Sequence, residues 1–153
     1  MKIGSILENQ EFEKRVAIMP EIVKKYISLG FEILLSKNYA SHLGIEDEEY
    51  LKVGAKTSSD ENEILGSCDI LVQLGILSDD KSSLIRENQI LIGVLNPYDN
   101  KKKLEELAKK KINLFSLELL PRITRAQSMD ILSSQANLAG YKAVIESFAN
   151  FEK

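Results

Sequence analysis

The residues best suited to chemistry lie together in a short segment near the end of the sequence. Gln127, Asp130, Ser133 and Asn137 are spaced by three or four residues, so in helical geometry they form one polar stripe. A flat carboxamide, such as that of nicotinamide, needs an acceptor for its NH2 group and a donor for its carbonyl oxygen. Aspartate supplies the acceptor, and glutamine, serine or the nearby Arg122 supplies the donor.

The same segment has a simpler interpretation as a helix start. Ser128 and Asp130 come just before the longest predicted helix, where short polar side chains commonly cap the first backbone N–H groups. Arg122 and Arg125 would then be solvated surface charges. The residue pattern alone leaves both interpretations open, and capping is the more common use of such residues.

Other kinds of site find little support in the sequence. The eight glycines never take the Gly-x-Gly-x-x-Gly spacing that holds a pyrophosphate after a strand, and no Walker-type loop occurs. One cysteine and one histidine cannot build the usual zinc site, so we predict no metal. We expect Cys68 to be a small core residue at a strand edge and His42 to be a loop or surface residue.

The composition indicates a folded globular chain, and we expect a single domain over residues 1–153. It is 44% apolar and 28% charged, and its net charge of −3 gives no basic field for nucleic acid. The longest apolar runs are strand-sized, well below the roughly 18 to 20 residues that cross a bilayer. We therefore expect a cytoplasmic chain without direct membrane insertion, whose membrane association comes through a partner.

Short apolar runs alternate with helical patterns along the sequence. The predicted strands are residues 2–7, 31–35, 69–74, 90–95 and 112–117, and the predicted helices are 20–29, 45–53, 61–65, 99–110 and 129–151. This order predicts an α/β fold with a doubly wound, mostly parallel five-stranded sheet of the flavodoxin type and a long C-terminal helix. Ligands of such folds bind at the carboxyl ends of the strands, here the loops after residues 7, 74, 95 and 117.

Two stretches of the sequence resemble a known family. Residues 121–141, Pro-Arg-Ile-Thr-Arg-Ala-Gln-Ser-Met-Asp-Ile-Leu-Ser-Ser-Gln-Ala-Asn-Leu-Ala-Gly-Tyr, are closely similar to the signature loop and helix of the NAD-binding component of energy-linked transhydrogenases. The start of the chain, Met1-Lys2-Ile3-Gly4 with Glu8, Arg15-Val16-Ala17 and Pro20, resembles the wider family that includes alanine dehydrogenases. The chain is therefore identified as a member of the N-terminal domain family of alanine dehydrogenases and NAD(P) transhydrogenase alpha subunits.

The resemblance implies a function and a set of site residues. In the family, the matching arginine, glutamine, aspartate and serine contact the nicotinamide end of NAD(H). These residues are Arg122, Gln127, Asp130 and Ser133, and we assign the catalytic role to Gln127 and Asp130. Hydride would pass between NAD(H) on this component and NADP(H) on a separate component, while a membrane component couples the transfer to proton translocation. The family also implies a homodimer, attached to the inner membrane through its partner subunits.

Two alternatives remain open. An alanine-dehydrogenase-like enzyme needs a proton carrier and a cation for its substrate, and the neighbourhoods where that branch has lysine and histidine contain Gln73 and Asn96 instead. Arg15 remains as a possible carboxylate ligand, although a structural role is the preferred interpretation. A non-catalytic remnant or interaction domain is the second alternative. In the family a Rossmann domain that holds most of NAD follows, and we expect it to be absent here, so that the chain alone binds NADH weakly or not at all.

Overall fold

The computed structural model describes residues 1–151. The chain forms two compact units, Met1–Ser116 and Leu117–Lys153. The first, unit 1, contains the sheet and the loops at its carboxyl edge. The second, unit 2, contains the polar segment of residues 121–141 and the last helix.

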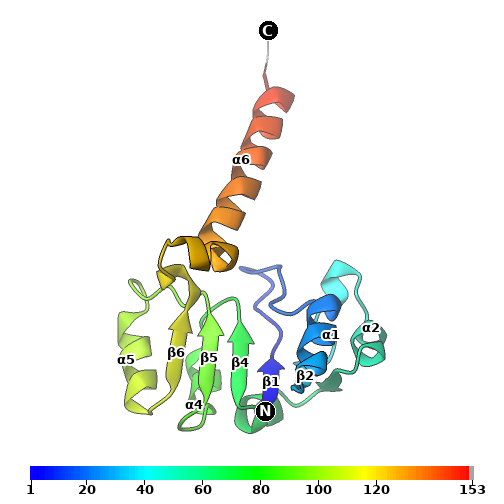
Figure 1. Cartoon of the computed structure of the whole chain (residues 1–153), viewed down its shortest axis with the longest axis vertical. Coiled ribbons are helices and arrows are strands. Elements are labelled where there is room, and N and C mark those ends of the chain that lie inside the picture. The colour runs from blue at the N-terminus through cyan, green and yellow to red at the C-terminus, as the bar shows by residue number, and fades with distance from the viewer. Residues whose placement is uncertain (152–153) are drawn as a thin grey trace. The chain divides into compact units, whose positions relative to one another are not determined.

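Within the described residues, unit 1 is built around a sheet of six parallel strands. The strands lie in the order β3-β2-β1-β4-β5-β6, and the labelled arrows of β1, β4, β5 and β6 point the same way in Figure 1. Their bounds are β1 (Lys2–Ser5), β2 (Glu32–Ser36), β3 (Lys56–Ser58), β4 (Ile70–Gln73), β5 (Ile90–Gly93) and β6 (Asn113–Ser116). All carboxyl ends therefore meet at one edge of the sheet.

The predicted fold class is confirmed, although the sheet has one strand more than the five predicted. The additional β3 is an edge strand of three polar residues, Lys-Thr-Ser, and carries no apolar signal. Without β3 the order would be that of the flavodoxin type. With β3 it is the 3-2-1-4-5-6 order of doubly wound dinucleotide-binding folds.

The predicted helices also form, with the starts that their sequences indicate. Pro20 occupies the first turn of α1, Glu46 and Glu49 form a capping box at α2, and the Asp60 side chain accepts a hydrogen bond from Asn62 N at α3. The bounds are α1 (Pro20–Ser28), α2 (Asp47–Lys52), α3 (Glu61–Ser67), α5 (Lys101–Lys109) and α6 (Ile131–Ala149). Four short elements were not predicted, namely α4 (Asp79–Ser83) and the 3-10 turns η1 (Ser41–Leu43), η2 (Leu117–Leu119) and η3 (Thr124–Met129).

Apolar side chains cover both faces of the sheet. Leu34 belongs to one buried cluster, together with residues of α3 and α5, whereas its neighbours Ile33 and Leu35 belong to another that includes residues of α1 and α2. Because successive strand residues point to opposite faces, the two clusters lie on opposite sides of the sheet. Cys68 is fully buried, and a methyl group on Gly4 would lie 2.6 Å from its sulfur. Its predicted core role is confirmed.

The chain changes direction across the sheet between β1 and β4. It first proceeds outward from β1 through β2 to β3, then crosses to β4 on the other side of β1 and proceeds outward to β6. In doubly wound folds, ligands bind beyond the carboxyl ends of the two strands at this reversal. The loops after β1 and β4 are therefore the expected place for a ligand in unit 1.

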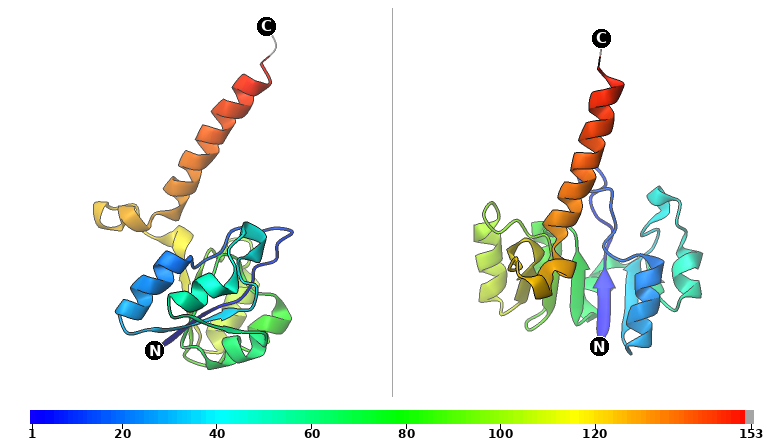
Figure 2. Two further views of the ribbon diagram at one scale, coloured as in Figure 1. Left: turned by 90° about the vertical axis from the view of Figure 1, so that its right-hand side faces the viewer. Right: turned by 45° about the horizontal axis from the view of Figure 1, so that its top comes forward.

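Unit 2 is dominated by one uninterrupted helix, α6 (Figure 1 and both views of Figure 2). It starts at Ile131 and ends at Ala149, two residues inside each end of the predicted range. None of its residues is buried, and its exposed apolar side chains, which include Leu138, Tyr141 and Phe148, do not share a single face. Among residues 1–151, none of the helices combines the length and apolar character that crossing a lipid bilayer requires.

Candidate functional site

A pocket in unit 1 opens at the carboxyl ends of β1 and β4, where the strand order reverses. Its volume is about 570 Å³, within the range that small-molecule sites occupy. Two loops supply most of its wall, the segment after β1 and the segment after β4. The residues lining it are Ile6, Leu7, Glu8, Asn9, Phe12, Glu13, Glu61, Gln73, Gly75, Ile76, Leu77, Ser78, Lys81 and Lys103.

A buried amide joins the two loops beneath the pocket. Gln73, the last residue of β4, is only 3% exposed. Its Oε1 accepts hydrogen bonds from Ile6 N at 2.8 Å and from Ser5 Oγ at 2.9 Å. Ser5 Oγ also lies 2.7 Å from the Tyr39 hydroxyl, which must be the donor because the Ser5 proton is directed to Gln73. This network fixes the end of β1 against the end of β4.

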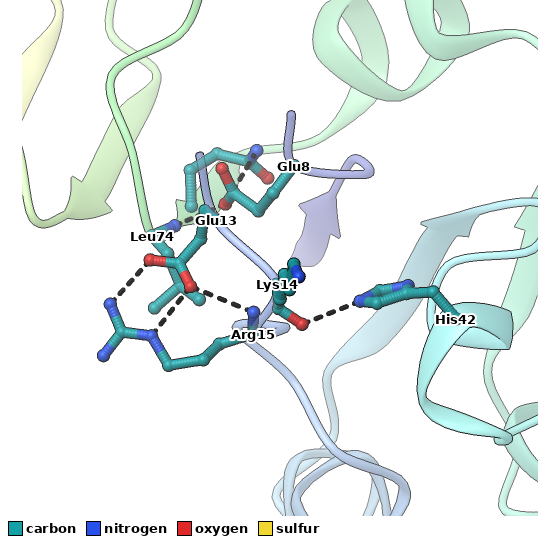
Figure 3. Close-up of polar contacts among 7 residues, drawn as sticks. Glu8, Glu13, Lys14, Arg15, His42 and Leu74 are labelled. Atoms are coloured by element: carbon teal, nitrogen blue, oxygen red, sulfur yellow. Dashed lines mark hydrogen bonds and ion pairs between the residues drawn. The ribbon is translucent and has the colours of Figure 1, made fainter. Parts of the chain in front are cut away.

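Glu8 links the same two loops with a carboxylate. Its Oε1 accepts hydrogen bonds from Leu74 N at 2.5 Å, the contact drawn in Figure 3, and from Gln73 Nε2 at 3.3 Å. Burial raises the pKa of Glu8 above its ordinary value, and the N–H groups of Leu74 and Gly75 offset only part of this effect. The pocket therefore contains a carboxylate whose charge is incompletely stabilised by its surroundings.

A second carboxylate of the pocket, Glu13, is paired within its own loop. Arg15 donates to it through Nε at 2.8 Å and through its terminal nitrogen at 2.6 Å, as Figure 3 shows. This bidentate pair lowers the pKa of Glu13 and raises the pKa of Arg15. The structural interpretation of Arg15 is supported, because its guanidinium already holds a carboxylate of the chain.

Two side chains from the other side of the sheet's switch point hold the loop between β1 and α1. The Tyr39 hydroxyl accepts hydrogen bonds from Ala17 N at 3.1 Å and Ile18 N at 3.2 Å. His42 Nε2 lies 2.7 Å from Lys14 O and is the donor, since a carbonyl oxygen can only accept (Figure 3). His42 is an exposed residue of η1, as predicted, and its contact gives it a structural use.

In unit 2, Asp130 caps α6. Its Oδ1 accepts hydrogen bonds from Leu132 N at 3.0 Å and Ser133 N at 3.1 Å, and its Oδ2 accepts one from Ser133 Oγ at 2.7 Å. The Ser133 hydroxyl is the main cause of a lowered pKa at Asp130, and the charge of Arg122 adds to it. The capping interpretation is therefore confirmed for Asp130, whose carboxylate remains exposed to solvent and ionised.

The predicted polar stripe is interrupted before α6 begins. Gln127 belongs to the 3-10 turn η3, and Asp130 has an extended backbone with φ of −75° and ψ of 92°. Only Ser133 and Asn137 of the predicted stripe lie on α6, so the expectation of one continuous helical stripe was wrong. The structure joins Asp130 to Ser133 by hydrogen bonds and to Arg122 through charge, whereas the hydrogen bond between Gln127 and Asp130 uses backbone atoms alone.

Sequence reasoning missed Glu8 and Gln73 as constituents of a site. Gln73 gave one usable signal, because an amide at the end of the apolar run of β4 needs buried partners. Glu8 gave none beyond its place after a strand. Among the described residues, no group of three or more His, Cys, Asp or Glu side chains is arranged to hold a metal ion.

Comparison with known proteins assigns relatives to the whole chain. The family described as alanine dehydrogenase/PNT, N-terminal domain, matches residues 5–139. A relative from Rickettsia prowazekii, described as the first of the parts that make up an NAD(P) transhydrogenase alpha subunit, is 41% identical, and its counterpart from Rhodospirillum rubrum is 40% identical. Both alignments cover all of this chain and 41% of the relative.

A solved structure is similar in fold as well as in sequence. It is described as a transhydrogenase from Sinorhizobium meliloti, and it superposes with a TM-score of 0.91 at 36% identity. The match covers all of this chain and 46% of that chain. The present chain thus spans less than half the length of the relatives that it matches.

Proposed function

Because the chain belongs to the family of alanine dehydrogenase/PNT N-terminal domains, we propose that it forms part of the NAD(H)-side component of a proton-translocating NAD(P) transhydrogenase. The observation that carries the proposal is the exposed pair of Asp130 and Ser133 within residues 121–141. This pair gives the segment a prearranged acceptor for a carboxamide. The nicotinamide ring of NAD(H) carries such a group.

The hydrogen bonds of Asp130 leave room for one more donor. An ionised carboxylate offers about four lone-pair sites. The three hydrogen bonds from Leu132 N, Ser133 N and Ser133 Oγ use three of them. The remaining site suits one N–H of a carboxamide, and the lowered pKa of Asp130 keeps the acceptor charged.

The donor for the carboxamide oxygen must come from other residues. The Ser133 hydroxyl already donates to Asp130, so toward a ligand it is an acceptor. Arg122 and Gln127 are the exposed donors of the predicted set, and both lie within the same short segment. Arg122 also offers its charge, which strengthens a hydrogen bond to a carbonyl oxygen. Ser133 therefore acts mainly by positioning Asp130.

The hydride chemistry belongs to the nicotinamide cofactors, which carry the transferred hydrogen when bound. The role of this chain is to orient the ring and to exclude water from it. Asp130, Arg122 and Gln127 would fix the ring through its carboxamide, and Ser133 would hold the Asp130 carboxylate in place. No proton is transferred in this role, so no general acid or base is required.

The rest of the proposed assembly lies outside this segment. The glycine pattern for a pyrophosphate does not occur in residues 1–153, so we place the grip on the rest of NAD(H) outside them. NADP(H) would bind to a partner component, and a membrane component would couple the reaction to proton passage. We further propose a cytoplasmic homodimer that is peripheral to the inner membrane through these partners.

An amino-acid dehydrogenase is the less favoured alternative. Such an enzyme needs a free cation for its substrate's carboxylate and a proton carrier. Arg15 is engaged by Glu13, and Gln73 is buried and spent on backbone and hydroxyl partners. Neither side chain is poised for that reaction.

A chimera tests the proposal. This chain would replace the matched segment of the Rickettsia prowazekii relative, assembled with that protein's own partners, and deuterium transfer from labelled NADH into NADPH would be measured. We expect transfer to be retained, and to fall by about tenfold or more in Asp130→Asn, as when a positioned hydrogen bond to a reacting group is lost. A chimera that folds and assembles but transfers no label would instead support a non-catalytic remnant.

A further inference from the structure

The charged side chains that line the pocket of unit 1 are almost all paired with an opposite charge. Lys81 lies 2.8 Å from Glu61, and Lys103 lies 2.6 Å from Asp79. Glu13 is held by Arg15. Among the described residues, no cation lies within 4 Å of the Glu8 carboxylate. One negative charge of the pocket therefore has no counterion.

The surroundings of Glu8 do not remove the need for one. Backbone N–H groups of Leu74 and Gly75 stabilise its ionised form, yet burial is the larger effect and the charge of Glu13 adds to it. Lys81 acts in the opposite direction, but it is the smallest influence and its ammonium is engaged by Glu61. A cation placed beside Glu8 would stabilise a charge that the protein leaves partly uncompensated.

The pocket has space and apolar surface next to this carboxylate. Gly75 carries no side chain, and a methyl group placed there would lie 3.5 Å from Glu8 Oε2. Leu77 is buried and Ile76 partly buried, while Phe12 is 86% exposed at the rim. A ligand that reaches Glu8 therefore passes aliphatic and aromatic walls, which suit an alkyl chain better than a hydrated metal ion.

We propose that this pocket binds a small primary alkylammonium ion, whose ammonium group pairs with the Glu8 carboxylate and whose alkyl chain lies against Phe12, Ile76 and Leu77. All of these residues belong to unit 1. The site is thus separate from the nicotinamide-facing segment, and its test does not require NAD(H).

Thermal unfolding of the 153-residue chain tests the site with n-butylammonium chloride as the probe. Sodium chloride at equal concentration controls for ionic strength, and n-butanol controls for the alkyl chain. At about ten times the dissociation constant, we expect n-butylammonium to raise the Tm by roughly 3 °C beyond both controls, with saturation. Glu8→Gln should abolish this rise, whereas Glu11→Gln, which removes an exposed carboxylate of the same loop outside the pocket, should retain it.

A tethered ammonium provides a second test that does not alter Glu8. Gly75→Lys would place a cationic side chain beside Glu8 at a position where a Cβ makes only an ordinary contact. We expect this variant to have a higher Tm than Gly75→Met and to lose its response to n-butylammonium. The proposal is overturned if n-butylammonium raises the Tm no more than the controls, if Glu8→Gln responds as the parent does, or if Gly75→Lys and Gly75→Met respond alike.

Discussion

At the scale of single residues, Asp130 combines two uses that the sequence presents as alternatives. Its carboxylate caps α6 through two backbone N–H groups, and the same carboxylate is held by the Ser133 hydroxyl and remains exposed. A cap of this kind fixes an acceptor at the start of a helix, where the N–H groups and the helix dipole favour negative charge. Capping therefore prepares the residue for ligand binding.

Two substitutions of Asp130 separate its uses. Asparagine caps helices about as well as aspartate, whereas alanine does not. We expect Asp130→Asn to preserve hydrogen-exchange protection at the amides of Leu132 and Ser133, and Asp130→Ala to lose it. Both variants should lower hydride transfer in the chimera. Equal activity of Asp130→Asn and the parent would show that the charge serves the helix alone.

The buried hydroxyl of Tyr39 is predicted to make stability depend on alkaline pH. Burial raises the pKa of Tyr39 from its ordinary value near 10 to about 12. The contribution of the neutral hydroxyl is therefore complete below about pH 10 and is lost as the pH rises through about 12. Equilibrium unfolding measured across this alkaline range should show the decline, and Tyr39→Phe should flatten it.

Tyr39→Phe should also be destabilising at neutral pH. The change leaves the N–H groups of Ala17 and Ile18 without their acceptor, a loss of about 1–3 kcal/mol. Tyr26→Phe is the matched control, because Tyr26 is only partly buried and its hydroxyl makes none of these contacts. Denaturant unfolding that gives the two variants equal stability would contradict the role assigned to Tyr39.

At the scale of elements, the contact between β4 and β5 depends on a glycine. Gly93 pairs with Gln73, and a methyl group on Gly93 would clash with the backbone oxygen of Gln73. We expect Gly93→Ala to cost about 1–3 kcal/mol in denaturant unfolding, because the strands must separate to admit it. Gly66→Ala on α3, where the added group meets open space, should be neutral or stabilising by up to about 1 kcal/mol. Equal losses in both would refute this packing argument.

The elements with strong local signals could be predicted from the sequence, and those without such signals could not. Apolar runs such as the one in β5, and the Pro20 start of α1, led to strands and helices whose ends differ from the structure by only a few residues. The polar β3 has no apolar residue and forms because it pairs with β2. The helix start near Asp130 was also placed correctly, but the turn of η3 before it was not, because no local signal distinguished it from a continuing helix.

The pocket could not be predicted, because its contacts join residues far apart in the sequence. Glu8 and Leu74 are separated by 66 positions, and only the parallel pairing of β1 with β4 brings them together. The rule that ligands bind where the strand order reverses does locate the region. The identity of the unpaired carboxylate within it depends on which neighbouring charges already have partners, and this is visible only in the structure.

At the scale of the whole molecule, the proposed function divides NAD(H) between this chain and other components of the assembly. Residues 121–141 would meet the nicotinamide end, and the sequence lacks the glycine pattern that grips a pyrophosphate. The chain also spans less than half of the relatives that it matches. Because each half of a dinucleotide contributes to its affinity, the chain alone should bind NADH weakly, and submicromolar binding in calorimetry would contradict this division.

The most direct measurement is an NMR titration of the isotopically labelled chain with the two halves of the dinucleotide. Nicotinamide mononucleotide should shift the amide signals of Arg122, Gln127, Asp130 and Ser133 progressively at millimolar concentration, whereas adenosine monophosphate should leave them unchanged. The same shifts should be absent in Asp130→Ala. Shifts caused equally by adenosine monophosphate, or confined to residues outside the segment 121–141, would contradict the claim that this segment faces the nicotinamide ring.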